Sequence, residues 1–325
     1  MKVVITGGGG FIGRKLAHRI LALGALTGPS GPAEAVTELV LFDAVAPPDG
    51  EFNDDRVRAV VGDITDAGLV ANVIDKDTDS VFHLAAVVSA GAEADFDLGY
   101  QVNLEGTRNV LEAARAADGT PRLVFASSLA VYGGDVPDTV GDLTPITPET
   151  SYGAQKVMGE YLITDYSRKG YIDGRAMRLP TIVVRPGKPN KAASGFASGI
   201  IREPLNGVDM VCPVTPESRM AIMSPRTVVE CFVHMHELDA TKLGASRAIL
   251  LSGFSVSMGD TAAAVNNLDT NRTRGKITFK VDPATQAIVD GWPKTTFSDK
   301  AGALGFPSDD NIADVIAAYI EDELD

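Results

Sequence analysis

The stretch Thr6-Gly7-Gly8-Gly9-Gly10-Phe11-Ile12-Gly13 decides the fold of this chain. It joins a short β-branched segment, residues 2–6, to residues 11–23, where apolar side chains recur at helical spacing. Glycines spaced Gly-x-x-Gly-x-x-Gly, a variant of the commoner Gly-x-Gly-x-x-Gly, permit a tight turn and let the backbone approach a pyrophosphate at the helix N-terminus. A hinge between domains is the alternative, but a hinge does not require the following helix. The pattern predicts a dinucleotide site formed by Gly7, Gly10, Phe11, Ile12 and Gly13.

A second expected strand, residues 38–42, ends at Asp43. A carboxylate at this strand end accepts hydrogen bonds from the adenosine ribose hydroxyls and repels a 2′-phosphate, so it favours NAD over NADP. Asp43 lies 30 residues after Gly13, more than the usual interval of about 20. Residues 27–32, rich in glycine and proline, account for the excess as an inserted turn. The alternative is an aspartate that only starts a turn.

Tyr152 and Lys156 are four positions apart in the segment Ser-Tyr-Gly-Ala-Gln-Lys. On a helix such positions share one face, so the phenol and the ammonium can point into one cleft. A tyrosine base needs a nearby cation, because its unperturbed pKa near 10 leaves little phenolate at neutral pH. Alternatively, the Tyr152 ring is half-buried and Lys156 is solvated. Together with the glycine turn, the pair indicates a nicotinamide-dependent enzyme.

Strands and helices alternate along the first 185 residues. We expect strands at 2–6, 38–42, 57–61, 81–84, 123–126 and 181–184, and helices at 11–23, 69–74, 98–117 and 152–168. This alternation predicts an α/β fold with a Rossmann-type doubly wound parallel sheet. After Pro186 the strand-like runs 249–251 and 276–281 look isolated, and an amphipathic helix, 310–324, closes the chain. We therefore expect an NAD-binding domain over residues 1–185 and a smaller C-terminal α/β substrate lobe over residues 186–325.

Residues at the ends of the expected strands complete the predicted cofactor site. Asp63 and Ile64 would flank adenine, although Asp63 would serve equally well as a helix cap. Leu84-Ala85-Ala86 offers small side chains where the cofactor must pass close to the backbone. Asn103 is a polar residue in an apolar helical segment, where it either faces the cofactor or bridges backbone groups in the core.

Composition excludes several classes of function. The chain has 325 residues, 45% of them hydrophobic, with a net charge of −14. No lysine- or arginine-dense stripe is present to neutralise nucleic-acid phosphates. No apolar run approaches the roughly 18 residues that span a bilayer, and Met1-Lys2 leads directly into a strand instead of a signal peptide. We expect a cytoplasmic enzyme that binds neither nucleic acid nor a membrane.

The only two cysteines, Cys212 and Cys231, are 19 residues apart. Because the paired histidine spacing of a zinc site is absent nearby, the two cysteines support neither a disulfide framework nor a zinc site. We expect two buried thiols and no bound metal.

Several motifs together resemble those of a known family. They are the glycine turn, Asp63-Ile64, His83-Leu84-Ala85-Ala86, the run Ser-Ser-Leu-Ala-Val-Tyr-Gly at 127–133 and Tyr-Gly-Ala-Gln-Lys at 152–156. Covering residues 1 to about 190, they resemble the extended short-chain dehydrogenase/reductases. Within that family, residues 178–194 and 196–207 are similar to a subfamily that oxidises D-erythronate, a four-carbon sugar acid. The resemblance implies a Rossmann fold, an NAD cofactor and oxidation of a secondary hydroxyl group.

The resemblance also implies catalytic roles. Carried over, Ser128 orients and polarises the substrate oxygen, and Tyr152 accepts the hydroxyl proton. Lys156 binds the nicotinamide ribose and lowers the pKa of Tyr152. Ser127 is expected to turn toward the cofactor. For the two serines, a plain transition from strand to loop is the alternative.

The carboxylate of a hydroxy acid needs a cation or several hydrogen-bond donors. The region expected to cap the cleft contains Lys188, Asn190, Lys191, Ser194, Arg202 and Arg219, each of which is otherwise a solvated surface residue. Of these we assign Asn190 and Lys191 to the substrate, with Ser89, Ser128 and Tyr152. A turn residue is the alternative for Ser89. His83 lies in an apolar strand and is expected to be structural.

Two other functions would use the same fold. A nucleotide-sugar epimerase or dehydratase would need an open groove for a diphosphate and would regenerate its NAD. A silent NAD-binding regulator would not need Ser128, Tyr152 and Lys156. The resemblance further implies a homodimer paired through the helices at 98–117 and 152–168, where Leu111 and Leu162 are apolar, although both would equally cover the core.

Overall fold

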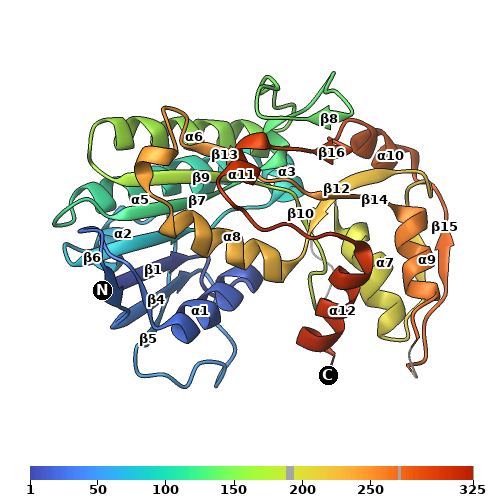
Figure 1. Cartoon of the computed structure of the whole chain (residues 1–325), viewed down its shortest axis with the longest axis horizontal. Helices are drawn as coiled ribbons and strands as arrows, with labels where there is room; N and C mark the ends of the chain where they lie inside the picture. Colours follow the sequence, from blue (N-terminus) through green and yellow to red (C-terminus); the bar gives the residue numbers. More distant parts are fainter. Residues whose placement is uncertain (188–193, 270–271, 325) are drawn as a thin grey trace.

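The computed structural model describes residues 1–187, 194–269 and 272–324. Its centre is a seven-stranded sheet in which every neighbouring pair is parallel, with the order β13-β9-β7-β6-β1-β4-β5 (Figure 1). Strand order reverses direction at β1, which is the doubly wound topology. The predicted α/β Rossmann class is therefore confirmed. The strands are β1 (Lys2–Thr6), β4 (Glu38–Asp43), β5 (Val57–Val61), β6 (Thr78–His83), β7 (Arg122–Ser128), β9 (Asp173–Leu179) and β13 (Ala248–Leu250).

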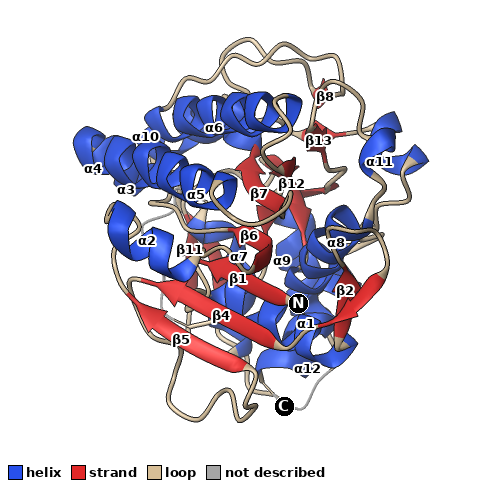
Figure 2. Ribbon diagram, turned by 90° about the vertical axis from the view of Figure 1, so that its left-hand side faces the viewer, coloured by secondary structure: helices blue, strands red, loops and turns tan. Residues whose placement is uncertain are grey.

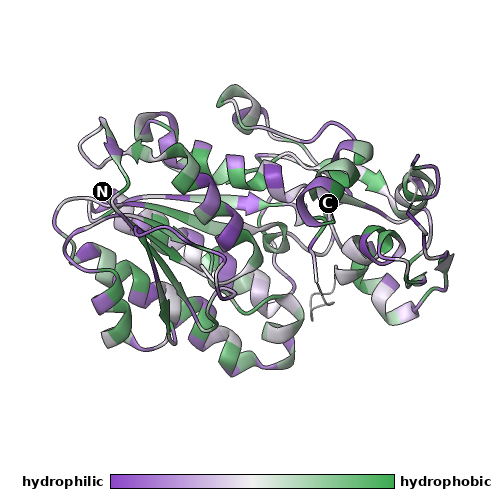
Figure 3. Cartoon of the chain, turned by 90° about the horizontal axis from the view of Figure 1, so that it is seen from below, coloured by the Kyte–Doolittle hydropathy of each residue, from purple (hydrophilic) through white to green (hydrophobic). Residues whose placement is uncertain are grey.

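Helices cover both faces of this sheet (Figure 2). One face carries α1 (Phe11–Leu23) and α8 (Pro225–Glu237), and the other carries α2 (Ala67–Val73), α5 (Gly106–Arg115) and α6 (Ser151–Arg168). Alternate residues of a strand point to opposite faces. Val3 and Ile5 pack under α1 and α8, whereas Val4 packs under the other three helices. Both faces are core, and Figure 3 accordingly shows mainly hydrophobic colouring along these strands.

A second, smaller lobe is built on a three-stranded sheet. In this sheet β12 (Arg219–Met223) pairs in parallel with β10 (Thr181–Ile182) and antiparallel with β14 (Phe254–Ser257). Apolar residues of α7 (Gly195–Leu205), α9 (Met258–Asn266) and α12 (Ile312–Glu323) share its core. The closing amphipathic helix is thus confirmed.

Short elements fill the connections. An antiparallel hairpin of β2 (Ala25–Thr27) and β3 (Ala33–Ala35) occupies the region where an inserted turn was expected. Two parallel pairs are β8 (Thr139–Val140) with β16 (Thr295–Thr296), and β11 (Met210–Cys212) with β15 (Ile277–Phe279). The remaining helical segments are α3 (Ser89–Ala94), α4 (Phe96–Tyr100), the π turn η1 (Gln101–Glu105), η2 (Leu129–Val131), η3 (Ala240–Lys242), α10 (Pro283–Asp290) and α11 (Asp299–Ala303).

Three strand predictions were wrong. The run at 276–281 is not isolated, because it contains β15, which pairs with β11. The sixth strand of the large sheet is β9, not residues 181–184, and the two residues of β10 join the small sheet instead. Pro180 separates them and has no N–H for a ladder. Arginines are typical of exposed segments, but Arg175 and Arg178 in β9 are both buried. Residues 248–250 are not isolated, because they form the seventh strand beside β9.

The expected helix at 98–117 is present in three parts, α4, the π turn and α5. After residue 185 the chain returns to the large sheet through α8 and β13. A division of the chain at residue 185 therefore stays a proposal.

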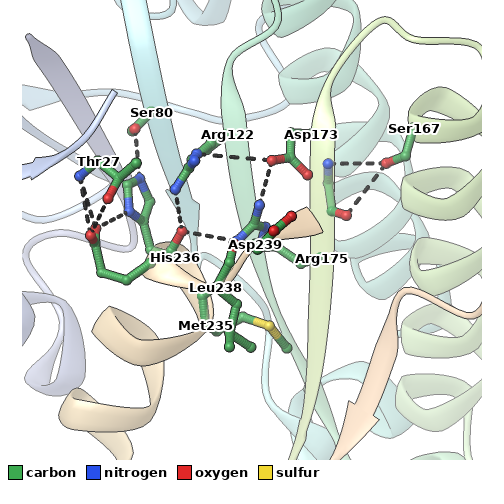
Figure 4. Close-up of polar contacts among 12 residues, drawn as sticks. Thr27, Ser80, Arg122, Ser167, Asp173, Arg175, Met235, His236, Leu238 and Asp239 are labelled. Atoms are coloured by element: carbon green, nitrogen blue, oxygen red, sulfur yellow. Dashed lines mark hydrogen bonds and ion pairs between the residues drawn. The ribbon is translucent and has the colours of Figure 1, made fainter. Parts of the chain in front are cut away.

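A buried polar cluster holds the C-terminal end of α8 against the large sheet (Figure 4). The Nη1 group of Arg175 donates to the carbonyls of Met235 (2.6 Å), His236 (2.9 Å) and Leu238 (2.8 Å). Arg175 also pairs with Asp173. The last carbonyls of a helix have no intrahelical partner, and a cation there complements the helix dipole. Arg175 therefore caps α8 from β9.

Among the described residues, no helix is both long and apolar enough to cross a bilayer. Cys212 and Cys231 are free and buried, as expected.

Candidate active site

The glycine-rich turn lies between β1 and α1, as predicted. Gly7 has a φ of +75°, and a Cβ there would lie 2.8 Å from the backbone nitrogen of Ala85. A Cβ on Gly13 would lie 2.1 Å from the Gly7 carbonyl oxygen. Gly10 is the N-cap of α1 and provides no side-chain cap. The first N–H groups of α1, from Phe11 onward, are therefore presented to a ligand, which fits a pyrophosphate.

Asp43 ends β4 beside this turn. Its Oδ2 accepts a hydrogen bond from the Gly9 N–H (3.1 Å), and its Oδ1 accepts one from the Val45 N–H (3.2 Å). The bond to Val45 fits the alternative in which Asp43 starts a turn, and the bond to Gly9 also connects Asp43 to the glycine turn. The same bonds hold the carboxylate at the rim of the glycine turn, where an adenosine ribose would lie.

Asp63 and Ile64 follow β5. The N-cap of α2 is Asp66, whose Oδ1 accepts from Leu69 N–H (3.0 Å), so Asp63 does not cap that helix. Asp63 is exposed, and the preceding Gly62 N–H donates to the Asp43 carbonyl (2.9 Å). This bond brings Asp63 to the same edge of the sheet as Asp43.

A chain of hydrogen bonds connects Ala85, just after β6, to Asn103 in the π turn. The Ala85 N–H donates to Thr6 Oγ1 (3.3 Å), which contacts His83 Nδ1 (2.7 Å). His83 Nε2 contacts Thr107 Oγ1 (2.9 Å), which donates to the Asn103 carbonyl (2.6 Å). Because Thr107 has used its only proton, His83 Nε2 must be the donor and Thr6 must donate to Nδ1. Burial lowers the pKa of His83 to about 3, so the ring is neutral and structural, as expected.

Asn103 is buried in the π turn. Its Oδ1 accepts from the Val87 N–H (2.8 Å), while its Nδ2 donates to the Val87 carbonyl (3.0 Å) and to Gln155 Oε1 (2.7 Å). These contacts match the alternative in which Asn103 bridges the backbone. Asn103 ties α6 to the loop that begins with Leu84-Ala85-Ala86 and ends at Ser89, the first residue of α3.

The ends of β7 and α6 bring Ser128, Tyr152 and Lys156 together. Ser128 lies close enough to the Tyr152 phenol to lower its pKa. Ser128 Oγ accepts from the Ala130 N–H (3.1 Å), which leaves its own proton for another acceptor. Lys156 Nζ lies 5.5 Å from the centroid of the Tyr152 ring and donates to the Ala126 carbonyl (2.8 Å).

Burial dominates the protonation of this group. Desolvation raises the pKa of Tyr152 to about 12, against the opposing effect of Ser128. Desolvation also lowers the pKa of Lys156 to about 7, against the opposing charge of Glu160. The expected lowering of the Tyr152 pKa by Lys156 is therefore not met in the chain alone, where loss of solvent around the phenol has the largest effect and only Ser128 opposes it.

The Ser127 side chain does not turn toward the cofactor as expected. Neighbouring strand residues point to opposite faces, and Ser127 Oγ donates to the buried Glu160 carboxylate (2.6 Å). Glu160 pairs with Arg178 (2.7 Å), which donates to the Tyr132 hydroxyl (2.8 Å). Only the backbone of Ser127 remains for a cofactor. Sequence reasoning missed this network, although an acidic residue one turn after Lys156 was a signal for it.

The structure describes some of the residues that were expected to bind the substrate carboxylate. Lys188, Asn190 and Lys191 lie outside the described residues. Arg202 is buried, donates to the Arg185 carbonyl (2.8 Å) and pairs with Glu203 (2.5 Å). Its guanidinium therefore already has partners within the protein, the Arg185 carbonyl and the Glu203 carboxylate.

Two further candidates lie at the lobe surface. Ser194 immediately precedes α7. Arg219 is exposed, and its Nη1 lies 3.7 Å from a carboxylate oxygen of Asp260. The structure shows Arg219 in a loose surface ion pair.

Comparison with known proteins agrees with this geometry. Residues 3–245 match the family described as the NAD dependent epimerase/dehydratase family. The chain belongs to this family. The resemblance to extended short-chain dehydrogenase/reductases is thereby confirmed.

Three similar proteins illustrate the likeness. The chain is 48% identical over 322 residues to the D-erythronate dehydrogenase of Cupriavidus necator, covering 99% of this chain and 98% of the relative. It is 44% identical over 324 residues to the D-erythronate dehydrogenase of Haemophilus influenzae, covering 100% of both. A crystal structure described as the nucleoside-diphosphate-sugar epimerase from Agrobacterium tumefaciens has a TM-score of 0.92 and 38% identity, covering 100% of this chain and 94% of that one.

Proposed function

We propose that the protein is an NAD-dependent dehydrogenase that oxidises a secondary hydroxyl of D-erythronate to give 2-dehydro-D-erythronate. The observation that carries the proposal is the 48% identity, over essentially the whole of both chains, to the enzyme of Cupriavidus necator. When bound, NAD supplies the acceptor for the carbinol hydride and a positively charged ring beside the substrate.

The glycine turn and Asp43 would hold the cofactor. The uncapped N-terminus of α1 suits the pyrophosphate. The Asp43 carboxylate, fixed by the Gly9 and Val45 N–H groups, would accept hydrogen bonds from the ribose diol and repel a 2′-phosphate. These contacts support NAD rather than NADP.

Ser128, Tyr152 and Lys156 would carry out the proton transfer. Ser128 donates to the substrate oxygen and keeps it beside the phenol. Tyr152 accepts the hydroxyl proton, which requires its pKa to fall from about 12. Positive charge close to the phenol lowers that pKa, and a protonated Lys156 contributes such charge. Burial gives these charges their strength, because little water is present to screen them.

A nucleotide-sugar epimerase is the second candidate, favoured by the description of the Agrobacterium tumefaciens structure. Purified protein is supplied with NAD and, separately, with D-erythronate, D-threonate, L-threonine and a UDP-hexose, and NADH is followed by absorbance. We expect continuous NADH formation with D-erythronate. Conversion of the UDP-hexose without net NADH, and none with D-erythronate, would replace the proposal by the epimerase.

We also propose a homodimer. Leu111 is fully buried and Leu162 packs on the same core, so neither supports pairing of subunits. Phe96 (56% exposed), Leu98 (42%) and Tyr161 (66%) lie on α4 and α6 and offer apolar surface instead. A light-scattering mass of one chain at micromolar concentration would contradict the dimer.

The cytoplasmic location expected from the sequence also stays a proposal. Its support is the NAD cofactor, which cells keep inside. The partner is a small sugar acid rather than a nucleic acid, in keeping with the net charge of −14.

A further inference from the structure

Arg185 lies just after β10, where the chain passes from the large sheet into the small lobe. Its backbone is held on both sides. The Arg185 N–H donates to Ser198 Oγ (3.0 Å), and its carbonyl accepts from Arg202 Nη1 (2.8 Å). Its side chain is partly buried. Within the part of the chain that the structure describes, the Arg185 guanidinium has no hydrogen-bond or ion-pair partner, and none of its nitrogens is sealed from solvent.

Two arginines later in the chain have acidic partners. Arg202 pairs with Glu203 (2.5 Å) and Arg226 pairs with Asp322 (2.5 Å). Arg185 instead faces the like charge of Arg202, and burial together with this charge lowers its pKa. A partly desolvated cation without a counter-ion is unfavourable. The fold therefore leaves at Arg185 a positive charge whose energy an incoming anion would lower.

The course of the chain places Arg185 near the catalytic strand ends. Leu179, the last residue of β9, is the register partner of Ser128. Arg185 follows six residues later, and no helix intervenes. Six residues span at most about 20 Å when fully extended. The Val183 N–H bonds the Met223 carbonyl (2.9 Å) and anchors this segment to the small lobe. Arg185 thus lies at the start of the small lobe, no more than about 20 Å along the chain from the strand end that pairs with Ser128.

The chemistry of the side chain specifies its ligand. A guanidinium presents a planar set of donors that matches the two oxygens of a carboxylate. We propose that Arg185 binds the carboxylate of the sugar-acid substrate and so makes the enzyme select an acid over an uncharged polyol. This proposal rests on the proposed function, and it names a residue that sequence reasoning did not consider.

The test compares Arg185→Gln and Arg185→Lys with wild type on D-erythronate and on its uncharged amide. For Arg185→Gln we expect kcat/KM for D-erythronate to fall on the order of 10²-fold, mainly through KM, because a charged hydrogen-bonded pair is lost. Reaction with the amide, which carries no charge, should change little, and so should the KM for NAD. Arg185→Lys should recover part of the loss, since it keeps the charge without the fork.

Arg226→Gln is the matched control, because it removes an exposed arginine from an ion pair on α8. Its kinetics should remain near those of wild type. An equal loss by Arg185→Gln on the acid and the amide would mean a structural role and would overturn the inference. If wild type is active on D-erythronate and Arg185→Gln keeps the wild-type kcat/KM, the inference is overturned and the proposed function stands. A wild-type enzyme inactive on D-erythronate would instead overturn the proposed function.

Discussion

Replacing Lys156 by methionine should stabilise the cofactor-free protein at neutral pH. Lys156 is only 3% exposed, and burial lowers its pKa from 10.5 to about 7. Since the unfolded chain then binds more protons than the folded chain between these two values, unfolding is favoured as the pH falls. The penalty is complete below about pH 7, shrinks from pH 7 to 10.5 and is absent above 10.5.

The size of the effect follows from the shift in pKa. A change from 10.5 to about 7 corresponds to roughly 5 kcal/mol. The hydrogen bond to the Ala126 carbonyl and the Phe125 ring, 4.7 Å from Nζ, both favour the ammonium and reduce that penalty by about 1 kcal/mol each. Methionine leaves the carbonyl unpaired, which costs about 1 kcal/mol more. We expect a net gain of about 1–2 kcal/mol in the free energy of unfolding.

Urea unfolding of cofactor-free protein at about pH 6, 8 and 10 measures this gain. The gain should be largest at the lowest pH and disappear toward pH 10. Lys169→Met, at the exposed end of the same helix, is the control and should change stability by less than about 0.5 kcal/mol. A Lys156→Met protein that is less stable at every pH, or whose gain does not depend on pH, would refute the reasoning.

Three other outcomes are expected. Tyr152→Phe should reduce turnover by about 10²–10⁴-fold, keep NAD affinity and remove the rise of kcat/KM with pH. In wild type, the pKa of that rise should lie below the cofactor-free value of about 12. A variant with more than about a tenth of wild-type kcat would exclude Tyr152 as the base. Asp43→Ser should weaken NAD binding and relax discrimination against NADP; equal use of both cofactors by wild type would contradict the ribose contact. Arg175→Met should lower the free energy of urea unfolding by about 3–5 kcal/mol, because three helix carbonyls and Asp173 lose a buried cation; a loss under about 1 kcal/mol would show that Arg175 does not cap α8.

Local patterns in the sequence were sufficient to predict the fold class and the glycine turn, whereas the catalytic role proposed for Ser128 came from family resemblance. The glycine turn and the helix after it depend on neighbours in the chain, and helix α1 begins and ends at the residues predicted. Tyr152 and Lys156 share one face of α6 because four residues make about one helical turn. Such features depend on backbone geometry, which the identity of nearby residues dictates.

The tertiary structure alone decided which polar groups have partners. Ser127 donates to Glu160, 33 positions away, and His83 lies between two threonines contributed by β1 and α5. Residue type did not distinguish Arg202, which is paired, from Arg185, whose guanidinium has no partner among the described residues. The protonation of Tyr152 and Lys156 likewise follows from burial by segments distant in sequence. Hydrogen bonding and desolvation depend on what surrounds a group in space, and no pattern along the chain contains that information.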